Sequence, residues 1–166
     1  PIKNFSLLID AFALLLKKNP RGLLVFAGSS VPREKAKLVR KIESYGIPDR
    51  VQFLGSLSNV VPLYCAADVL AVTSISESFS LVTLEAQICG TRCVISNGVP
   101  SEVIVSNAVR KMDAQDSAET WAEALLDTAY KGEKVSDIEE FDVHAVSRKL
   151  KNVYLKKWNE YMERAN

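Results

Sequence analysis

The residues best suited to chemistry lie in the segment 74–90, which contains two glutamates, Glu77 and Glu85, separated by seven residues. Glu85 has apolar residues one turn before it, Leu81 and Val82, and more one turn after it, so the pattern predicts that it lies on a buried apolar face. A buried carboxylate costs free energy unless it is hydrogen-bonded or paired. A ligand's hydroxyl groups, an arginine or a backbone N–H would each satisfy it. Glu77 by itself has the position of an exposed acid in a loop.

This segment joins the carboxyl end of an apolar strand, Asp68 to Thr73, to a helix expected from about Leu81 to Cys89. The first N–H groups of a helix have no partner inside it, and the helix dipole is positive at that end. Such a junction attracts anions, phosphates included. Because Glu77 lies in the connecting loop, we expect it at the mouth of the crevice.

Strand and helix patterns alternate from residue 23 to residue 96. This alternation predicts an α/β fold, a Rossmann-like and mostly parallel sheet with helices on both faces. Ligands bind such sheets beyond the carboxyl ends of the strands. The loops of interest therefore follow Ala27, Leu54, Thr73 and Ser96.

Element boundaries follow from apolar periodicity, capping residues and glycine or proline stops. We expect Asn4 to cap the first helix and Ser58 to cap a short helix that includes Leu63. A right-handed crossover normally begins with a strand, so we expect the sheet's first strand upstream of the first helix. The remaining elements are expected as strands at about 23–27, 50–54, 68–73, 92–96 and 109–112, and as helices at about 32–45, 81–89, 117–130 and 141–164, with a helical turn at about 102–105.

Composition limits the classes of protein that fit. The 166 residues suit one domain, taken here as 1–166. With 21 basic and 20 acidic residues, the net charge of +1 argues against a nucleic-acid binder. The odd number of cysteines, three, and the absence of a Cys-x-x-Cys motif indicate reduced thiols in a cytoplasmic protein rather than disulfides or a zinc site.

The two glutamates stand in the sequence Glu-Ser-Phe-Ser-Leu-Val-Thr-Leu-Glu-Ala, followed by Cys-Gly-Thr. This pattern resembles the signature of family 4 glycosyltransferases, whose usual form is Glu-(Gly/Ser)-Phe-Gly-Leu, then Glu-Ala, then Gly-x-Pro. Shorter segments resemble the same family in the same order, over about residues 1 to 131. They are Lys3-Asn-Phe, Phe26-Ala-Gly28, Val51-Gln-Phe-Leu-Gly55 and Asn97-Gly-Val-Pro-Ser-Glu-Val103.

The resemblance implies the carboxyl-terminal, donor-binding half of a retaining glycosyltransferase with the GT-B fold, which contains two Rossmann-like domains. It implies that Glu77 contacts hydroxyls of the donor sugar and that Glu85 binds the ribose of the nucleotide. Lys3 would neutralise the diphosphate leaving group. The residues implied in donor binding besides Glu85 are Ser80, Leu81, Val82, Gly28 and Leu54.

Fixed cations and N–H dipoles stabilise the charge that develops on the phosphate oxygen as the sugar–phosphate bond breaks. No metal and no other cofactor is therefore expected, and the sequence contains no Asp-x-Asp motif. Three features depart from the family pattern. Ser80 replaces a glycine, Arg92 stands where proline is common and is expected to affect only the turn, and the family's arginine would fall upstream of Lys3.

Other candidate residues have simpler interpretations. His144, the only histidine, is expected to be structural, and Trp121 and Trp158 are expected to be packing residues. Lys149, Lys151, Lys156 and Lys157 make the last helix basic. A solvated face, a contact with the inner face of a membrane and a return to the amino-terminal domain all remain open for this helix.

We therefore predict the donor-binding domain of an enzyme that transfers a hexose from a nucleotide diphosphate sugar to a glycan or lipid-linked acceptor. The setting implied by the family is surface polysaccharide biosynthesis. The expected partners are the nucleotide sugar and an amino-terminal, acceptor-binding domain of the same full-length chain, without which this fragment should be inactive. The alternatives are half of a nucleotide-sugar epimerase and a non-catalytic nucleotide-binding module.

Overall fold

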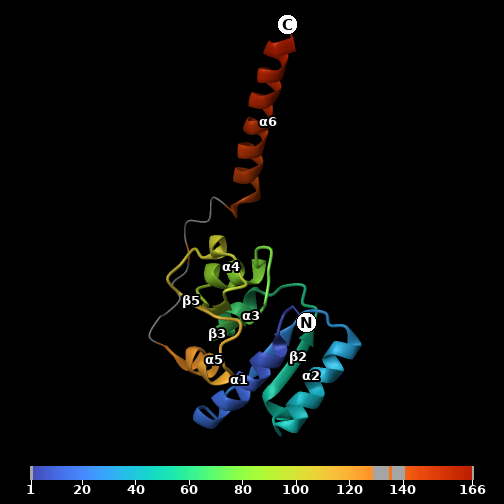
Figure 1. The fold of residues 1–166 in the computed structure, drawn as a ribbon, viewed down its shortest axis with the longest axis vertical. Coiled ribbons are helices and arrows are strands. Elements are labelled where there is room, and N and C mark those ends of the chain that lie inside the picture. Colours follow the sequence, from blue (N-terminus) through green and yellow to red (C-terminus); the bar gives the residue numbers. More distant parts are fainter. Residues whose placement is uncertain (1, 129–134, 136–140, 166) are drawn as a thin grey trace. The chain divides into compact units, whose positions relative to one another are not determined.

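The computed structural model describes residues 2–128, 135 and 141–165, with side chains to residue 158. It divides into two compact units, Pro1–Val135 and Ser136–Asn166. The second unit contains helix α6, Val143–Ala165. The elements of the first unit are α1 (Phe5–Lys18), β1 (Leu24–Ala27), α2 (Pro32–Ser44), η1 (Pro48–Arg50), β2 (Val51–Gly55), α3 (Val61–Ala66), β3 (Val69–Val72), α4 (Leu81–Ile88), β4 (Arg92–Ser96), η2 (Ser101–Val103), β5 (Val109–Met112) and α5 (Ala118–Leu126) (Figure 1).

All strand pairs in the described residues are parallel, which confirms the predicted α/β class. The strands form two hydrogen-bonded sheets, β1–β2 and β3–β4–β5. Leu24 lies opposite Val51 in the first sheet, and Val69 lies opposite Arg92 in the second. β4 has a strand on each side and is buried along its whole length, as expected for the central strand of a parallel sheet.

Residues of helices α1 and α5 and of strands β4 and β5 form the buried core. α1 packs along α5 and also contacts α2, while α4 contacts β3, β4 and α3 (Figure 1). Trp121 of α5 is completely buried, and its indole N–H donates to the carbonyl of Asp113 at 3.1 Å, which confirms its packing role. The buried cluster around it consists of Leu8, Ala11, Val94, Met112, Ala122, Ala124 and Leu125.

The predicted helix starts were partly right. Asn4 is the N-cap of α1, but it has a left-handed backbone (φ 48°) and its side chain makes no capping hydrogen bond. Ser58 was wrong as the cap of α3, because the N-cap is Val60 and the Asn59 side chain accepts the Val61 N–H at 3.1 Å. Ser117 caps α5, where its hydroxyl accepts the Thr120 N–H.

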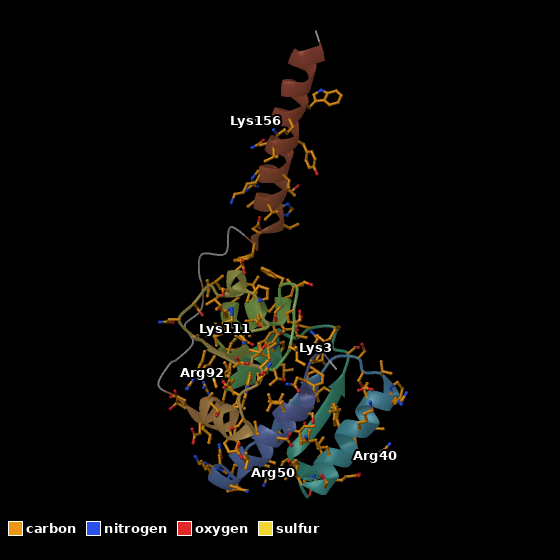
Figure 2. The ribbon with its side chains drawn as sticks, viewed as in Figure 1. Lys3, Arg40, Arg50, Arg92, Lys111 and Lys156 are labelled. Carbon is orange, nitrogen blue, oxygen red and sulfur yellow. The ribbon has the colours of Figure 1, made fainter. Side chains whose placement is uncertain are left out.

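α5 ends at Leu126 rather than at the predicted Tyr130. Arg92 lies next to this end and points toward α5 (Figure 2). Its guanidinium donates to the carbonyls of Ala124 at 3.3 Å and Leu125 at 2.8 Å, and also to the carbonyl of Asp127. The expectation that Arg92 affects only the turn was therefore wrong. Its cationic side chain is buried and satisfies carbonyls at the negative end of the helix dipole.

α6 is one helix over nearly the predicted range, and the Asp142 carboxylate accepts the N–H groups of His144 and Ala145 in its first turn. Within the second unit Trp158 is 60% exposed and Tyr154, one turn before it, is 71% exposed. The packing role expected of Trp158 stays a prediction. Within the residues described, no helix combines the length and the apolar character of a membrane span.

Candidate active site

The start of the chain lies against the carboxyl end of β3. The Ile75 N–H donates to the carbonyl of Ile2 at 2.7 Å. The Thr73 hydroxyl lies 3.0 Å from the carbonyl oxygen of Lys3 and 3.1 Å from that of Asn4. These contacts hold Lys3, labelled in Figure 2, beside a loop that follows it by 70 residues or more.

Lys3 forms an ion pair with Glu77, which lies in that loop. The Lys3 Nζ lies 2.5 Å from Glu77 Oε1, and the Ser74 hydroxyl donates to the same oxygen at 2.8 Å. The Glu77 side chain is 14% exposed and the Lys3 side chain 55% exposed. Burial alone would raise the pKa of Glu77, but the hydrogen bonds from Lys3 and Ser74, with the charge of Lys3, outweigh it and lower that pKa below its ordinary value. Glu77 is therefore a carboxylate at neutral pH.

The loop after β4 supports the backbone of Glu77. The Glu77 N–H donates to the carbonyl of Gly98 at 2.9 Å. A Cβ on Gly98 would lie 2.3 Å from the carbonyl oxygen of Ile75, so no other residue fits there without movement. The Ser96 hydroxyl also donates to the carbonyl of Ser74. The loops that follow β3 and β4 are thus fastened together at the carboxyl ends of their strands.

Ser80 is the N-cap of α4, and its backbone is left-handed, with φ 77° and ψ 70°. Glycine adopts this conformation at less cost, which explains why the family pattern has glycine at this position. The hydroxyls of Ser80 and Thr83 are hydrogen-bonded at 2.8 Å. In the described part of the chain the N–H groups of Leu81 and Val82 have no hydrogen-bond acceptor. Their side chains are 63% and 44% exposed, so this end of α4 is open to an anionic ligand.

The predicted burial of Glu85 was wrong, because its side chain is exposed. Leu81 and Val82 are exposed as well, and the buried side of α4 is the one that carries Thr83, Leu84 and Gln87. Glu85 is nevertheless held in place, since the hydroxyl of the buried Tyr64 donates to its Oε2 at 2.9 Å. Burial and this hydrogen bond raise the pKa of Tyr64. Among the contacts described, Glu85 accepts this hydrogen bond at Oε2 and none at Oε1.

Gly28 and Leu54 lie at the carboxyl ends of β1 and β2. The Gly28 N–H donates to the carbonyl of Gly55 at 2.7 Å, and Leu54 is 43% exposed. Gly28 has φ 119°, a conformation that strongly favours glycine, although a Cβ there would meet no atom within 4 Å. The contacts described place Gly28 against Gly55, the residue after Leu54, and connect neither Gly28 nor Leu54 with Glu77 or Glu85.

Three neighbours of the glutamates were not identified from the sequence. Ser74 precedes Glu77 by three residues, but a serine in a serine-rich loop carries no distinctive signal. Tyr64 could have been suspected as a polar tip on a short apolar helix that packs against α4. The sequence indicated Gly98 as part of the family segment 97–103, but not as a support for Glu77, which depends on the close approach of Ile75. Among the residues described, no three His, Cys, Asp or Glu side chains group in a way that would hold a metal ion.

Comparison with known proteins identifies a family whose sequences this chain resembles. A family model described as "Glycosyl transferases group 1" matches residues 1–141. Two relatives named D-inositol 3-phosphate glycosyltransferase are 42% identical over 132 residues in Mycolicibacterium smegmatis and 35% identical over 133 residues in Corynebacterium efficiens. Each match covers 75% of this chain but only 29% and 31% of the respective relative. The chain thus spans about a third of these relatives' length.

Solved structures show the same architecture. Anabaena Alr3699/HepE, solved in complex with UDP, has a TM-score of 0.66 at 26% identity over 75% of this chain and 35% of that one. The same protein has been solved with UDP-glucose. The C-terminal domain of LpcC, a glycosyl transferase group 1 family protein from Francisella tularensis, has a TM-score of 0.65 at 26% identity, over 75% of this chain and 67% of that domain.

Proposed function

The chain belongs to the group 1 glycosyltransferase family, and from that premise we propose that it binds the nucleotide diphosphate sugar donor of a retaining hexosyltransferase. The observation that carries the proposal is the Lys3–Glu77 pair beside the open amino end of α4. A diphosphate is bound by a cation and by free N–H groups, and sugar hydroxyls donate to a carboxylate. Glu77 can serve as that carboxylate because its pKa is lowered.

Each group has a role in this proposal. Lys3 and the N–H groups of Leu81 and Val82 bind the diphosphate and stabilise the negative charge that grows on it as the glycosidic bond breaks. Glu77 accepts hydrogen bonds from sugar hydroxyls, and Glu85, oriented by Tyr64, accepts them from the ribose. Gly28 and Leu54 contribute a second wall at the ends of β1 and β2. No step in this scheme uses a metal ion.

The relatives support parts of this scheme. The HepE complexes with UDP and UDP-glucose support a uridine diphosphate sugar as the first donor to test. The D-inositol 3-phosphate glycosyltransferases support a phosphorylated cyclitol as an acceptor to be tested beside the glycan or lipid-linked acceptor of surface polysaccharide biosynthesis. In this proposal the acceptor binds outside the third of the relatives' length that this chain matches.

We place this domain, residues 1–166, in a longer cytoplasmic enzyme whose other half binds the acceptor. A contact of α6 with the inner face of a membrane remains an alternative to its use within the enzyme.

Calorimetric titration of the 166-residue chain tests the proposal. We expect UDP, GDP or ADP to bind and one nucleotide sugar of the same base to bind more tightly through Glu77. Glucose, galactose, mannose and N-acetylglucosamine donors form the second panel. Failure of every nucleotide and nucleotide sugar to bind would overturn the proposal. Binding of a nucleotide with no dependence on the sugar would favour a non-catalytic nucleotide-binding module, and epimerisation of a bound nucleotide sugar would favour the epimerase.

A further inference from the structure

Gln87 is a buried polar side chain that the scheme above does not use. It is fully buried in α4, two residues after Glu85. Its amide nitrogen donates to the carbonyls of Thr83 at 3.0 Å and Val103 at 2.9 Å. Its amide oxygen accepts from the N–H groups of Val105 at 3.0 Å and Ser106 at 3.2 Å, and from the Ser106 hydroxyl at 3.1 Å. One side chain thus satisfies backbone groups on two segments.

The loop 97–106 is bonded to Gln87 and also to the backbone of Glu77. Gly98 is the second residue of the loop 97–106, and its carbonyl accepts the Glu77 N–H at 2.9 Å. The loop ends at Val105 and Ser106, whose N–H groups donate to Gln87. Val99 and Val103, between these two points, are fully buried. Gly98 is packed so tightly against Ile75 that even a Cβ would not fit. The loop therefore has little freedom to move at one end without moving the other.

We infer that Gln87 is a positioning residue for donor recognition, which sets the place of Glu77 relative to α4 through the loop 97–106. This inference rests on the proposed function, in which Glu77 meets the sugar and the amino end of α4 meets the diphosphate. Both are parts of one ligand, so their spacing determines whether the intact donor fits. Gln87 fixes that spacing because it belongs to α4 and bonds to the loop that carries Gly98.

The first test uses the chain without ligand. In Gln87→Met, which keeps the length of the side chain but removes its polar atoms, we expect faster amide hydrogen exchange at Val105, at Ser106 and also at Glu77. The matched control is Arg92→Met, since Arg92 is also buried and bonds several backbone carbonyls, but at the end of α5. Faster exchange at Val105 and Ser106 with no change at Glu77 would reduce Gln87 to a local structural residue and overturn the inference.

The second test measures affinity by calorimetry for a nucleoside diphosphate and for the matching nucleotide sugar. Gln87→Met should weaken the nucleotide sugar about tenfold, as the loss of one hydrogen bond would, and leave the nucleoside diphosphate nearly unchanged. In a Glu77→Gln background it should add little, because both changes remove the same contact. Equal weakening of both ligands, or full additivity with Glu77→Gln, would contradict the inference.

If Gln87→Met does not fold, Ser106→Ala serves in both tests, with the same signs and smaller effects. It removes the hydroxyl that donates to Gln87 Oε1 at 3.1 Å and that also accepts the Ala108 N–H at 3.3 Å. The two proposals fail in different ways. Absence of nucleotide binding by the wild-type chain would contradict the proposed function, whereas the exchange of the Glu77 N–H reports on Gln87 whether or not a ligand binds.

Discussion

The ammonium group of Lys3 and the carboxylate of Glu77, 74 positions apart in sequence, are joined by a 2.5 Å hydrogen bond at the carboxyl end of β3. Each group thereby neutralises the other in the absence of a ligand. A diphosphate that binds Lys3 competes with Glu77, and a sugar hydroxyl that donates to Glu77 replaces part of what Lys3 supplied. In the proposed complex the donor would replace the Lys3–Glu77 contact with two contacts of its own, one to each side chain.

The pH dependence of stability should report this pair. The pKa of Glu77 is lowered in the folded chain from 4.5, so its contribution to stability is present above about 4.5 and is lost as the pH falls through the lower, folded-state value. The difference in unfolding midpoint between the wild-type chain and Glu77→Gln should be constant from about pH 7 to about pH 5.5 and should shrink only below pH 4.5. Chemical denaturation at each pH measures it. A difference that stays constant below pH 4.5, or that grows as the pH falls, would show that Lys3 and Ser74 do not lower the pKa.

The two glutamates should fail differently when they are neutralised. Glu85→Gln weakens acceptance of ribose hydroxyls, so it should weaken a nucleoside diphosphate and its sugar conjugate alike. The loss of a charged hydrogen bond costs about 1.5–3 kcal/mol, which is about one to two decades in affinity. Glu77→Gln should weaken only the nucleotide sugar. It also frees Lys3, so the bare nucleoside diphosphate should bind at least as tightly as it does to the wild-type chain.

Calorimetry with both ligands and both variants separates these outcomes. Tyr64→Phe is a useful companion, because it leaves the Glu85 charge intact and removes the hydroxyl that orients it. It should give a smaller version of the Glu85→Gln result. If Glu77→Gln weakens the bare nucleotide as much as Glu85→Gln does, the assignment of sugar to one glutamate and ribose to the other is wrong.

Nucleotide binding should not depend on a divalent metal ion, because Lys3 and the amino end of α4 supply the positive potential. Titrations with Mg²⁺ and with EDTA should give the same affinity within about twofold, a difference of roughly 0.4 kcal/mol. Lys3→Met should lower the affinity of the nucleoside diphosphate in both solutions. A large loss on chelation, with little effect of Lys3→Met, would show that a metal ion rather than Lys3 neutralises the diphosphate.

The fold could be predicted from the sequence because parallel strands leave a strong local signal. Apolar runs such as 92–96 end at glycines or turns and alternate with helical periodicity. What failed was the choice of a buried face on α4, where apolar residues occur on both sides of the helix. Leu81 and Val82 suggested that Glu85 is buried, while the polar residues that α4 buries are Thr83 and Gln87. Periodicity shows that a helix has apolar residues, but tertiary packing decides which of them are covered.

The candidate site could be predicted only in its outline. The family resemblance assigned Glu77 and Lys3 to one ligand, and the structure brings these two together. Ser74, Tyr64 and Gly98 act through contacts between segments distant in sequence, and such contacts leave no spacing pattern. Arg92 illustrates the same limit, since nothing near it in sequence indicates that it reaches the end of α5.

Arg92 provides a prediction about stability that is independent of ligand binding. It is the first residue of β4, at the opposite end of the strand from the candidate site, and its guanidinium bonds carbonyls of Ala124, Leu125 and Asp127. Arg92→Met leaves these carbonyls without their charged donor in a buried place. We expect the free energy of unfolding to fall by about 2–3 kcal/mol, the usual range for a broken buried polar network.

Arg92→Lys should recover only part of this loss, because an ammonium group cannot reproduce the planar, multiply bonded geometry of the guanidinium. Lys111→Met is the control, since Lys111 bonds only one exposed hydroxyl, that of Ser101, among the contacts described, and it should change stability by less than about 0.5 kcal/mol. Urea denaturation measures all three variants. Nucleotide affinity at a temperature where each variant is folded should equal that of the wild-type chain. A Met variant as stable as the wild-type chain would show that the carbonyls at the end of α5 find other partners.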